Sequence, residues 1–142
     1  MKISDFFKSD GVNFASYDNY RKIASVADGL KTSARKCLYT FLKNSITTPK
    51  KVEQLQSLTA EQTQYIHGAQ SLYGVIVGMA QDFAGANNIP YFKREGTFGT
   101  RPIPIAAAGR YIFTCMEDYL GLIYRKEDNP VLIEQNFEGD LI

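Results

Sequence analysis

Residues 51–83 read KVEQLQSLTAEQTQYIHGAQSLYGVIVGMAQDF, and this stretch decides the fold. Apolar side chains recur at helical spacing over residues 52–58, and residues 59–62 (TAEQ) have the form of a capping box that begins another helix. The pair at residues 67–68 (HG) interrupts the pattern, which resumes over residues 70–83. A short helix, a turn and a longer helix are the layout of a helix-turn-helix.

Two more helices are predicted before this stretch. Residues 14–25 alternate apolar and polar groups at helical spacing, and a turn pair then ends the pattern. Thr32 or Ser33 can cap a second helix, in which residues 34–42 repeat apolar side chains. Lys36 lies on the opposite, polar face of this second helix.

The chain changes character after the helix-turn-helix. Residues 89–92 are short and β-like, and glycines and prolines then break the chain repeatedly. A basic, glycine-broken segment followed by the β-prone residues 110–114 predicts the wing of a winged helix. Residues 120–124 predict a last short helix.

These elements predict a mainly α (α+β) fold of the winged-helix class. At 142 residues and 44% hydrophobic composition, the chain is long enough to bury a core of its own. We therefore expect a single domain over residues 1–142, with the helix-turn-helix at about residues 51–84 and the wing with the segment after it at about residues 89–114.

The sequence also indicates the cellular compartment. The apolar runs are far shorter than the ~20 residues of a membrane-spanning helix, and the first ten residues carry charges instead of a signal-peptide core. We expect a soluble intracellular protein, cytoplasmic or nucleoid-associated. Cys37 and Cys115 stand in apolar settings without metal-ligand spacing, which predicts buried thiols.

The net charge of +1 conceals an uneven distribution. Between Arg21 and Lys51 there are many lysines and arginines and a single acid, Asp28. A second basic cluster faces only Glu95 in the local sequence and consists of Lys93, Arg94, Arg101 and Arg110. Taken alone, these charges are most simply explained as solvated helix faces. Evidence for a nucleic-acid partner must therefore come from the sequence motifs.

A series of short motifs runs along the chain in one order: Asn19-x-Arg21 with Ser25, Asp28-Gly29-Leu30-Lys31, Arg35-Lys36-x-Leu38-Tyr39, Lys51-Val52-x-Gln54-Leu55, Tyr65-x-His67-Gly68-x-Gln70-Ser71-Leu72, Ala80-Gln81-x-Phe83, Asn87-Asn88, Gly96-x-Phe98-Gly99-Thr100-Arg101 and Arg110-Tyr111-Ile112-Phe113-Thr114. This order resembles the breakage-reunion winged-helix domain of type IIA DNA topoisomerases. The motif wording is nearer the eukaryotic topoisomerase II enzymes. The size and the methionine start resemble the separately encoded medium subunit of phage topoisomerases, and a cloned domain is an equal alternative.

The resemblance implies that Tyr111 is the nucleophile of a transesterification. Its phenol oxygen would attack a DNA phosphodiester and form a transient 5′-phosphotyrosyl link. A tyrosine phenol ordinarily has a pKa of about 10, so it needs nearby cations to act at neutral pH, and Arg110 is one. Without the resemblance, a tyrosine in such a β-prone run would be taken for a strand residue.

Further roles follow from the resemblance. Arg35 would contact the cleaved phosphate from the preceding helix, and His67 would stabilise the transition state or move a proton at the start of the recognition helix. Gly96 and Gly99 would permit the turn of the wing. Residues expected to bind DNA are Arg21, Lys31, Lys36, Lys51, Gln70, Ser71 and Arg101.

The sequence departs from the family at two places. Residues 66–69 read IHGA where many relatives have His-His-Gly-Glu, and residues 102–105 read PIPI where the family has a loop with glycine and lysine. No Asp-x-Asp motif or Gly-rich nucleotide motif occurs. The resemblance therefore implies that Mg²⁺ and ATP bind outside this chain, on a Toprim-type and ATPase part, in a homodimeric enzyme that acts on double-stranded DNA.

A non-catalytic winged-helix DNA-binding module or regulator is the alternative. A regulator reads base edges, yet the predicted recognition helix offers few side chains that can do so, namely Gln70, Ser71 and Gln81. The topoisomerase reading predicts a chain that is inactive, or nearly so, until its partner supplies the metal site.

Overall fold

The computed structural model describes residues 2–131, 136–137 and 140–141. Met1 and the acids Glu134 and Glu138 lie outside the described residues. The elements are α1 (Ile3–Lys8), α2 (Asp10–Lys22), α3 (Thr32–Lys43), β1 (Lys50–Lys51), α4 (Val52–Gln62), α5 (Ala69–Ala80), β2 (Phe92–Glu95), β3 (Phe113–Met116), α6 (Leu120–Ile123), the 3₁₀ helix η1 (Lys126–Val131), β4 (Asn136–Phe137) and β5 (Asp140–Leu141).

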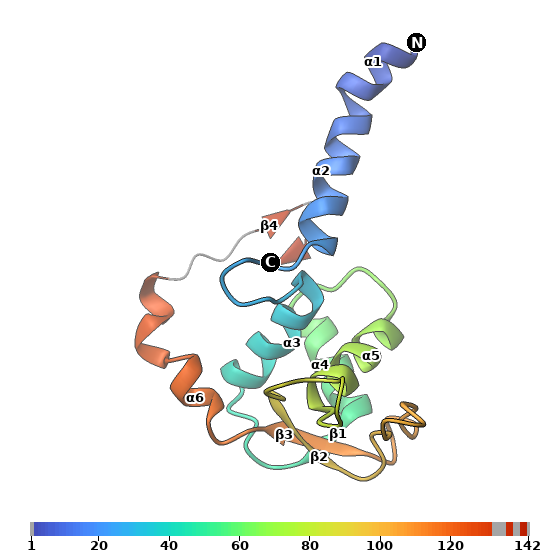
Figure 1. Cartoon of the computed structure of the whole chain (residues 1–142). Coiled ribbons are helices and arrows are strands. Elements are labelled where there is room, and N and C mark those ends of the chain that lie inside the picture. Colours follow the sequence, from blue (N-terminus) through green and yellow to red (C-terminus); the bar gives the residue numbers. More distant parts are fainter. Residues whose placement is uncertain (1, 132–135, 138–139, 142) are drawn as a thin grey trace.

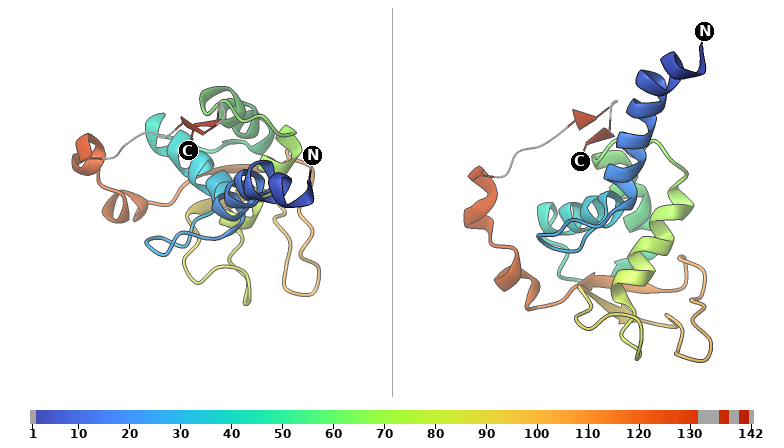
Figure 2. Two further views of the ribbon diagram at one scale, coloured as in Figure 1. Left: turned by 90° about the horizontal axis from the view of Figure 1, so that it is seen from above. Right: turned by 45° about the horizontal axis from the view of Figure 1, so that its top comes forward.

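Helices α3, α4 and α5 lie over a small antiparallel sheet in the order β1-β3-β2 (Figure 1). This α+β arrangement, with α4 and α5 as the helix-turn-helix and the sheet as the base of the wing, confirms the predicted winged-helix class. Helices α1 and α2 project from the body as an arm, and neither contains a buried residue. Both views in Figure 2 show the loop between β2 and β3 extending from the sheet end of the body.

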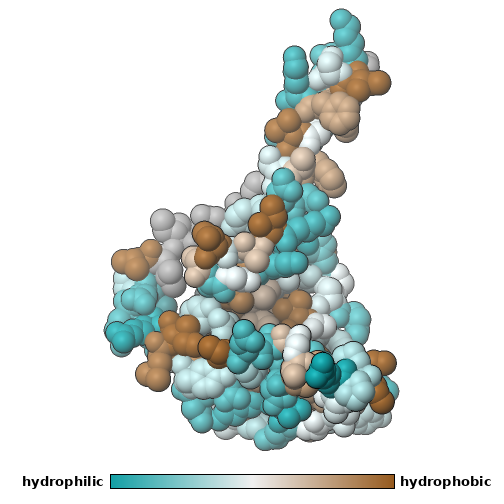
Figure 3. All heavy atoms as spheres, in the orientation of Figure 1, coloured by the Kyte–Doolittle hydropathy of each residue, from teal (hydrophilic) through white to brown (hydrophobic). Residues whose placement is uncertain are grey.

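The arm exposes much apolar surface (Figure 3). Its exposed large apolar side chains include Ile3, Phe6, Phe7, Val12 and Phe14. Within the described residues, no helix is both long and apolar enough to cross a bilayer.

Helix α4 is continuous, so the predicted capping box at residues 59–62 is wrong. Thr59 lies inside the helix, is fully buried, and donates its hydroxyl to the backbone oxygen of Leu55 at 2.8 Å. A threonine that bonds back to its own helix in this way continues the helix instead of starting one. Helix α5 begins at Ala69, as the interruption at residues 67–68 predicts.

Two helix boundaries also differ from the sequence prediction. Helix α2 begins at Asp10 and ends at Lys22, several residues earlier than the predicted residues 14–25. Neither Thr32 nor Ser33 caps α3, because Lys31 is the N-cap residue and no side chain bonds to the first turn. The apolar repeat of residues 34–42 lies within α3 as predicted.

The strand predicted at residues 110–114 begins later, at Phe113. The N–H of Tyr111 donates to Ala108 O at 2.8 Å, which makes a turn, and the Ile112 oxygen accepts from helix α4. Because these backbone groups are already engaged, residues 110–112 do not extend the pairing of β3 with β2. That pairing begins at Phe113, which lies opposite Glu95, and ends at Met116, which lies opposite Phe92.

The core joins the helices to the sheet. Phe41 of α3 stacks on Phe92 of β2 with ring centroids 3.9 Å apart, and both rings are fully buried. Cys37 and Cys115 are buried free thiols, which confirms that prediction. Burial raises the pKa of the Cys37 thiol to about 12, so this thiol stays protonated and unreactive.

Gly99 is required by the packing of the loop between β2 and β3. Its φ is +89°, a conformation that favours glycine. A Cβ atom here would lie 2.8 Å from the carbonyl carbon of Pro104, and backbone atoms cannot move aside as a flexible side chain can. The expectation that Gly99 permits the turn is confirmed.

We predict that Gly99→Ala lowers the free energy of unfolding by about 2–4 kcal/mol, because backbone strain and a steric clash add together. Gly85→Ala is the matched control. Gly85 has a φ of +95° and open space around its Cβ position, so it carries the strain alone and should cost about 1 kcal/mol. Urea unfolding of both variants measures the difference, and equal losses would show that the contact with Pro104 is unimportant.

Candidate active site

Tyr111 is presented to solvent on a tight turn. Its side chain is 66% exposed, and the guanidinium carbon of Arg110 lies 5.0 Å from the centroid of its ring. A guanidinium over an aromatic face is a favourable cation–π arrangement. The predicted nucleophile and its neighbouring cation are therefore adjacent and accessible.

The N-terminus of helix α4 holds this turn on both sides of Tyr111. The N–H of Val52 donates to Ile112 O at 3.1 Å, and the N–H of Glu53 donates to Gly109 O at 3.2 Å. The first N–H groups of a helix lack partners within the helix, and here the turn supplies them. Strand β1 continues the attachment by pairing Lys51 with Phe113, which brings exposed Lys51 beside the Tyr111 turn.

Helix α5 supports the same segment from another direction. The Tyr73 hydroxyl donates to Ala107 O at 2.8 Å. The side-chain amide of Gln81 donates to Phe98 O at 2.8 Å and lies 3.4 Å from Pro104 O. Gln81 is thus a structural residue and not an outward-facing base reader, because its amide is committed to backbone oxygens.

His67 lies in the turn between α4 and α5. Its ring meets the ring of Tyr65 edge-on, with centroids 5.4 Å apart. The Tyr65 hydroxyl is 2.6 Å from Ser71 Oγ, and Ser71 donates to Gly68 O at 2.7 Å, so Ser71 is engaged within the turn. Among the described residues, His67 Nε2 is buried from solvent and has no hydrogen-bond partner. Gln70 is exposed at the start of α5.

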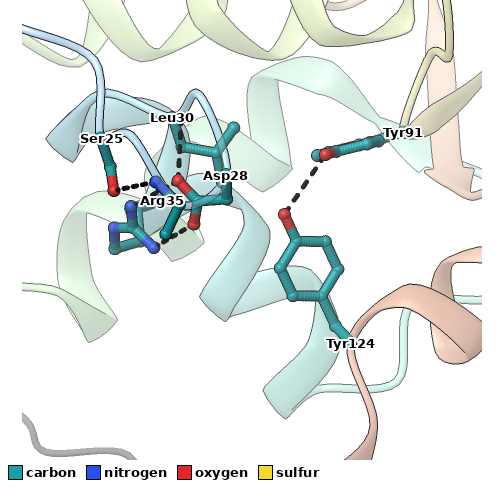
Figure 4. Close-up of polar contacts among 7 residues, drawn as sticks. Ser25, Asp28, Leu30, Arg35, Tyr91 and Tyr124 are labelled. Carbon is teal, nitrogen blue, oxygen red and sulfur yellow. Dashed lines mark hydrogen bonds and ion pairs between the residues drawn. The ribbon is translucent and has the colours of Figure 1, made fainter.

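Arg35 is held by a carboxylate (Figure 4). Its two terminal nitrogens lie 2.5 and 2.8 Å from the Asp28 oxygens, and the N–H of Leu30 donates to the same carboxylate at 3.0 Å. Burial tends to raise the pKa of Asp28, but these hydrogen bonds and the Arg35 charge outweigh it and lower the pKa. The hydrogen bond to Asp28 raises the pKa of Arg35. The pair stays fully ionised at neutral pH.

Two tyrosines meet near this pair. Tyr124 donates to the Tyr91 hydroxyl at 3.3 Å, and burial, followed by this hydrogen bond, raises the pKa of Tyr124 (Figure 4). This hydrogen bond joins the residue after α6 to the residue before β2.

Lys36 does not lie on an exposed DNA-binding face, so that prediction is wrong. It is only 3% exposed, and its ammonium donates to Thr63 O at 3.0 Å. The ammonium also lies 5.7 Å from the centroid of the Tyr65 ring. Lys36 therefore joins α3 to the turn that carries His67, and its charge is used inside the protein.

Arg21 comes close to the same turn. A cavity of about 160 Å³ lies between the end of α2, the start of α3 and Tyr65, and it is lined by Asp18, Arg21, Lys22, Thr32, Ser33 and Tyr65. Arg21 lies 5.2 Å from the centroid of the Tyr17 ring. Lys31, at the N-cap of α3, is exposed.

The second basic cluster is partly neutralised, contrary to the sequence prediction. Lys93 pairs with Asp118 at 2.7 Å, and Arg94 pairs with Asp82 at 2.9 Å. The hydrogen bond to Asp118 raises the pKa of Lys93. Asp118 and Asp82 lie in other segments of the chain, so a count of charges in the local sequence missed them. Arg101 and Arg110 are exposed.

The structure thus brings the predicted residues together in two groups. Arg110, Tyr111 and Lys51 share one face at the end of the sheet, whereas Arg21 and His67 lie around the α2–α3 junction and the turn before α5. Three supporting residues escaped prediction: Asp28, Tyr65 and Tyr73. Only Asp28 had a signal, since it is the lone acid in the first basic segment.

Comparison with known proteins agrees with this geometry. The family described as the A-subunit of DNA gyrase/topoisomerase IV matches residues 21–142. The chain is 44% identical over 133 residues to DNA topoisomerase 2 of Candida glabrata, covering 92% of this chain and 10% of that protein. It is 40% identical over 134 residues to DNA topoisomerase 2 of Invertebrate iridescent virus 6, covering 93% of this chain and 12% of that protein.

A solved structure is also similar. The topoisomerase II DNA-binding, cleavage and re-ligation domain of Plasmodium falciparum superposes with a TM-score of 0.88 at 37% identity, covering 97% of this chain and 19% of that chain. The chain spans about a tenth of the length of the curated relatives. It belongs to the A-subunit family of DNA gyrase/topoisomerase IV and corresponds to the breakage-reunion region of type IIA DNA topoisomerases.

Proposed function

We propose that this chain supplies the nucleophile for DNA cleavage and religation by a type IIA topoisomerase. The observation that carries the proposal is Tyr111, exposed beside Arg110 on a turn whose flanking carbonyls are fixed by helix α4. A nucleophile held on a rigid support spends less free energy on alignment with the phosphate. Exposure leaves the phenol open to a large substrate such as duplex DNA.

The reaction exchanges one phosphodiester for another. A bond forms between the Tyr111 oxygen and phosphorus, and the bond from phosphorus to the 3′ oxygen breaks. The phenol loses its proton and the departing 3′ oxygen gains one, which leaves a 5′-phosphotyrosyl link and a free 3′ hydroxyl. The guanidinium of Arg110 stabilises the phenolate and the charge that develops on phosphorus.

Arg35 and His67 act on the same phosphate in this proposal. A guanidinium carries more N–H donors than Asp28 engages, so Arg35 can bind a phosphate while the carboxylate holds it in place. His67 has a buried ring nitrogen without a partner among the described residues, and a phosphate oxygen or a transferred proton would satisfy it.

Other exposed residues hold the DNA backbone on either side. They are Lys31, Lys51, Gln70 and Arg101, together with the half-buried Arg21. Ser71, which was also expected to bind DNA, already donates its hydroxyl to Gly68 O, so it can bind DNA only if that bond opens. The regulator alternative is less well supported, because Ser71 and Gln81 are already committed to backbone oxygens. Gln70 alone remains of the three polar side chains that were expected to read bases.

The remaining parts of the enzyme lie outside this chain. Type II topoisomerases depend on Mg²⁺ and ATP, yet no three histidine, cysteine or acidic side chains gather into a metal site within the part of the chain that the structure describes. We propose that a Toprim-type metal-binding part and an ATPase part complete a homodimer that passes one duplex through another.

DNA binding by the chain should be largely indifferent to sequence and should weaken by about tenfold or more between about 50 and 200 mM salt, because cations and not base readers supply the affinity. Fluorescence anisotropy with several unrelated duplexes measures both properties. A strong preference for one sequence that persists at high salt would favour the regulator.

Arg35→Ala and His67→Ala should each reduce DNA cleavage by the reconstituted enzyme by about 100-fold or more, while binding changes by about threefold or less. Each side chain acts on one phosphate, whereas many cations share the affinity. Lys43→Ala, at the exposed far end of α3, is the matched control and should leave both quantities unchanged. Normal cleavage by either active-site variant would remove that residue from the mechanism.

Tyr111→Phe should abolish the covalent adduct and leave stability and DNA affinity intact, because it removes one exposed oxygen. The measurement traps the reconstituted enzyme on DNA with denaturant and maps the adduct by peptide mass. Wild type should carry a 5′-phosphate on Tyr111. An adduct on Tyr91 or Tyr119, or an undiminished adduct in the variant, would overturn the proposal.

A further inference from the structure

The segment that leads to the nucleophile has no large side chain with which to hold itself to the body. Residues 106–109 read AAAG, so the four residues before Arg110 carry at most a methyl group each. Groups on other elements must therefore hold this segment, and they must act on its backbone. We call residues 106–109 the nucleophile support.

Tyr73 of the recognition helix α5 binds the nucleophile support through its hydroxyl. The hydroxyl donates to Ala107 O at 2.8 Å and lies 3.5 Å from Ala106 O. The bonds from helix α4 to the turn around Tyr111, and the bond within that turn, join backbone groups only. Tyr73 therefore supplies a contact that depends on one side chain and that a single substitution can remove.

The ring of Tyr73 packs against the same segment at Gly109. A Cβ atom on Gly109 would lie 3.3 Å from Cδ2 of Tyr73 and 3.1 Å from the backbone nitrogen of Glu53. Both distances are shorter than ordinary van der Waals contact, so a methyl group here would displace its neighbours by a few tenths of an ångström. The absence of a side chain at Gly109 lets the nucleophile support lie against α5 and the start of α4 at once.

We propose that Tyr73 is a positioning residue for the nucleophile, because its hydroxyl and ring hold the nucleophile support and thereby set where the Tyr111 oxygen meets the phosphate. This inference rests on the proposed function. Attack on phosphorus requires an approach close to the line of the breaking bond, and a displacement of about 1 Å can slow such a step about 100-fold. Tyr73 and the exposed Gln70 lie about one turn apart on α5, so the nucleophile is placed relative to the helix expected to contact DNA.

The test uses the reconstituted enzyme with Tyr73→Phe, which keeps the ring and removes the hydroxyl. The maximal rate of DNA cleavage should fall about tenfold, whereas DNA affinity and its salt dependence should stay unchanged, because the lost bond aligns the nucleophile and contacts no DNA. Tyr119→Phe is the matched control. The Tyr119 hydroxyl donates to Pro90 O, so this variant also loses a bond from a phenol to a backbone oxygen, but outside the nucleophile support, and it should cleave at the wild-type rate.

A duplex with sulfur in place of the 3′ bridging oxygen separates alignment from proton transfer to the leaving group. The phosphorus–sulfur bond breaks and the sulfur departs as a thiolate, which needs no proton, whereas the Tyr111 oxygen must still approach phosphorus in line. Tyr73→Phe should therefore remain about tenfold slower than wild type on this substrate. Gly109→Ala should slow cleavage of both substrates, because its methyl group displaces the same segment, and it tests the contact independently of the Tyr73 hydroxyl.

The outcomes separate this inference from the proposed function. Wild-type rates in both Tyr73→Phe and Gly109→Ala, an equal loss in Tyr119→Phe, or recovery of Tyr73→Phe on the sulfur substrate would overturn the role of Tyr73 and leave the role of Tyr111 intact. A wild-type enzyme that binds and cleaves DNA without an adduct on Tyr111 would overturn the proposed function and this inference with it.

Discussion

The site depends on two backbone hydrogen bonds that the N-terminus of helix α4 donates to the turn around Tyr111. A helix has unpaired N–H groups at its start, and the carbonyls of Gly109 and Ile112 satisfy two of them. These bonds hold the residues on either side of Tyr111, while the N–H of Tyr111 itself donates to Ala108 O, so Tyr111 stays in a turn outside strand β3. The start of helix α4 therefore fixes the backbone on both sides of an exposed nucleophile.

Opposite charges arrange the rest of the surface. Asp28 fixes Arg35, Asp118 fixes Lys93 and Asp82 fixes Arg94. The exposed pairs of Lys93 and Arg94 contribute little to stability and partly offset the positive charge of those two side chains, whereas Asp28 holds Arg35 in place. Arg110 and Lys51 are exposed, and they lie at the turn that carries Tyr111.

Hydrophobic periodicity predicted the helices of the body well, because the packing against the sheet requires it. The prediction failed where a polar side chain or backbone group finds its hydrogen-bond partner only in the folded protein. Thr59 bonds to its own helix, and Lys36 donates to a carbonyl that sequence cannot place nearby. The strand predicted over Tyr111 failed for the same reason, since Tyr111 N–H donates to Ala108 O and the carbonyl of Ile112 accepts from α4. The candidate residues came from the resemblance to the family, whereas Tyr65 and Tyr73 gave no signal because their partners lie in other segments.

The recognition helix in this chain has a structural task. The side chains of Ser71, Tyr73 and Gln81 all bond to backbone oxygens, the first within its own turn and the other two in the loop that leads to Tyr111. Of the three side chains expected to read base edges, Ser71 and Gln81 are engaged with backbone oxygens, and Gln70 is exposed at the start of α5. The hydrogen bonds of Tyr73 and Gln81 instead support the loop that leads to Tyr111, so these polar groups help to place the nucleophile turn.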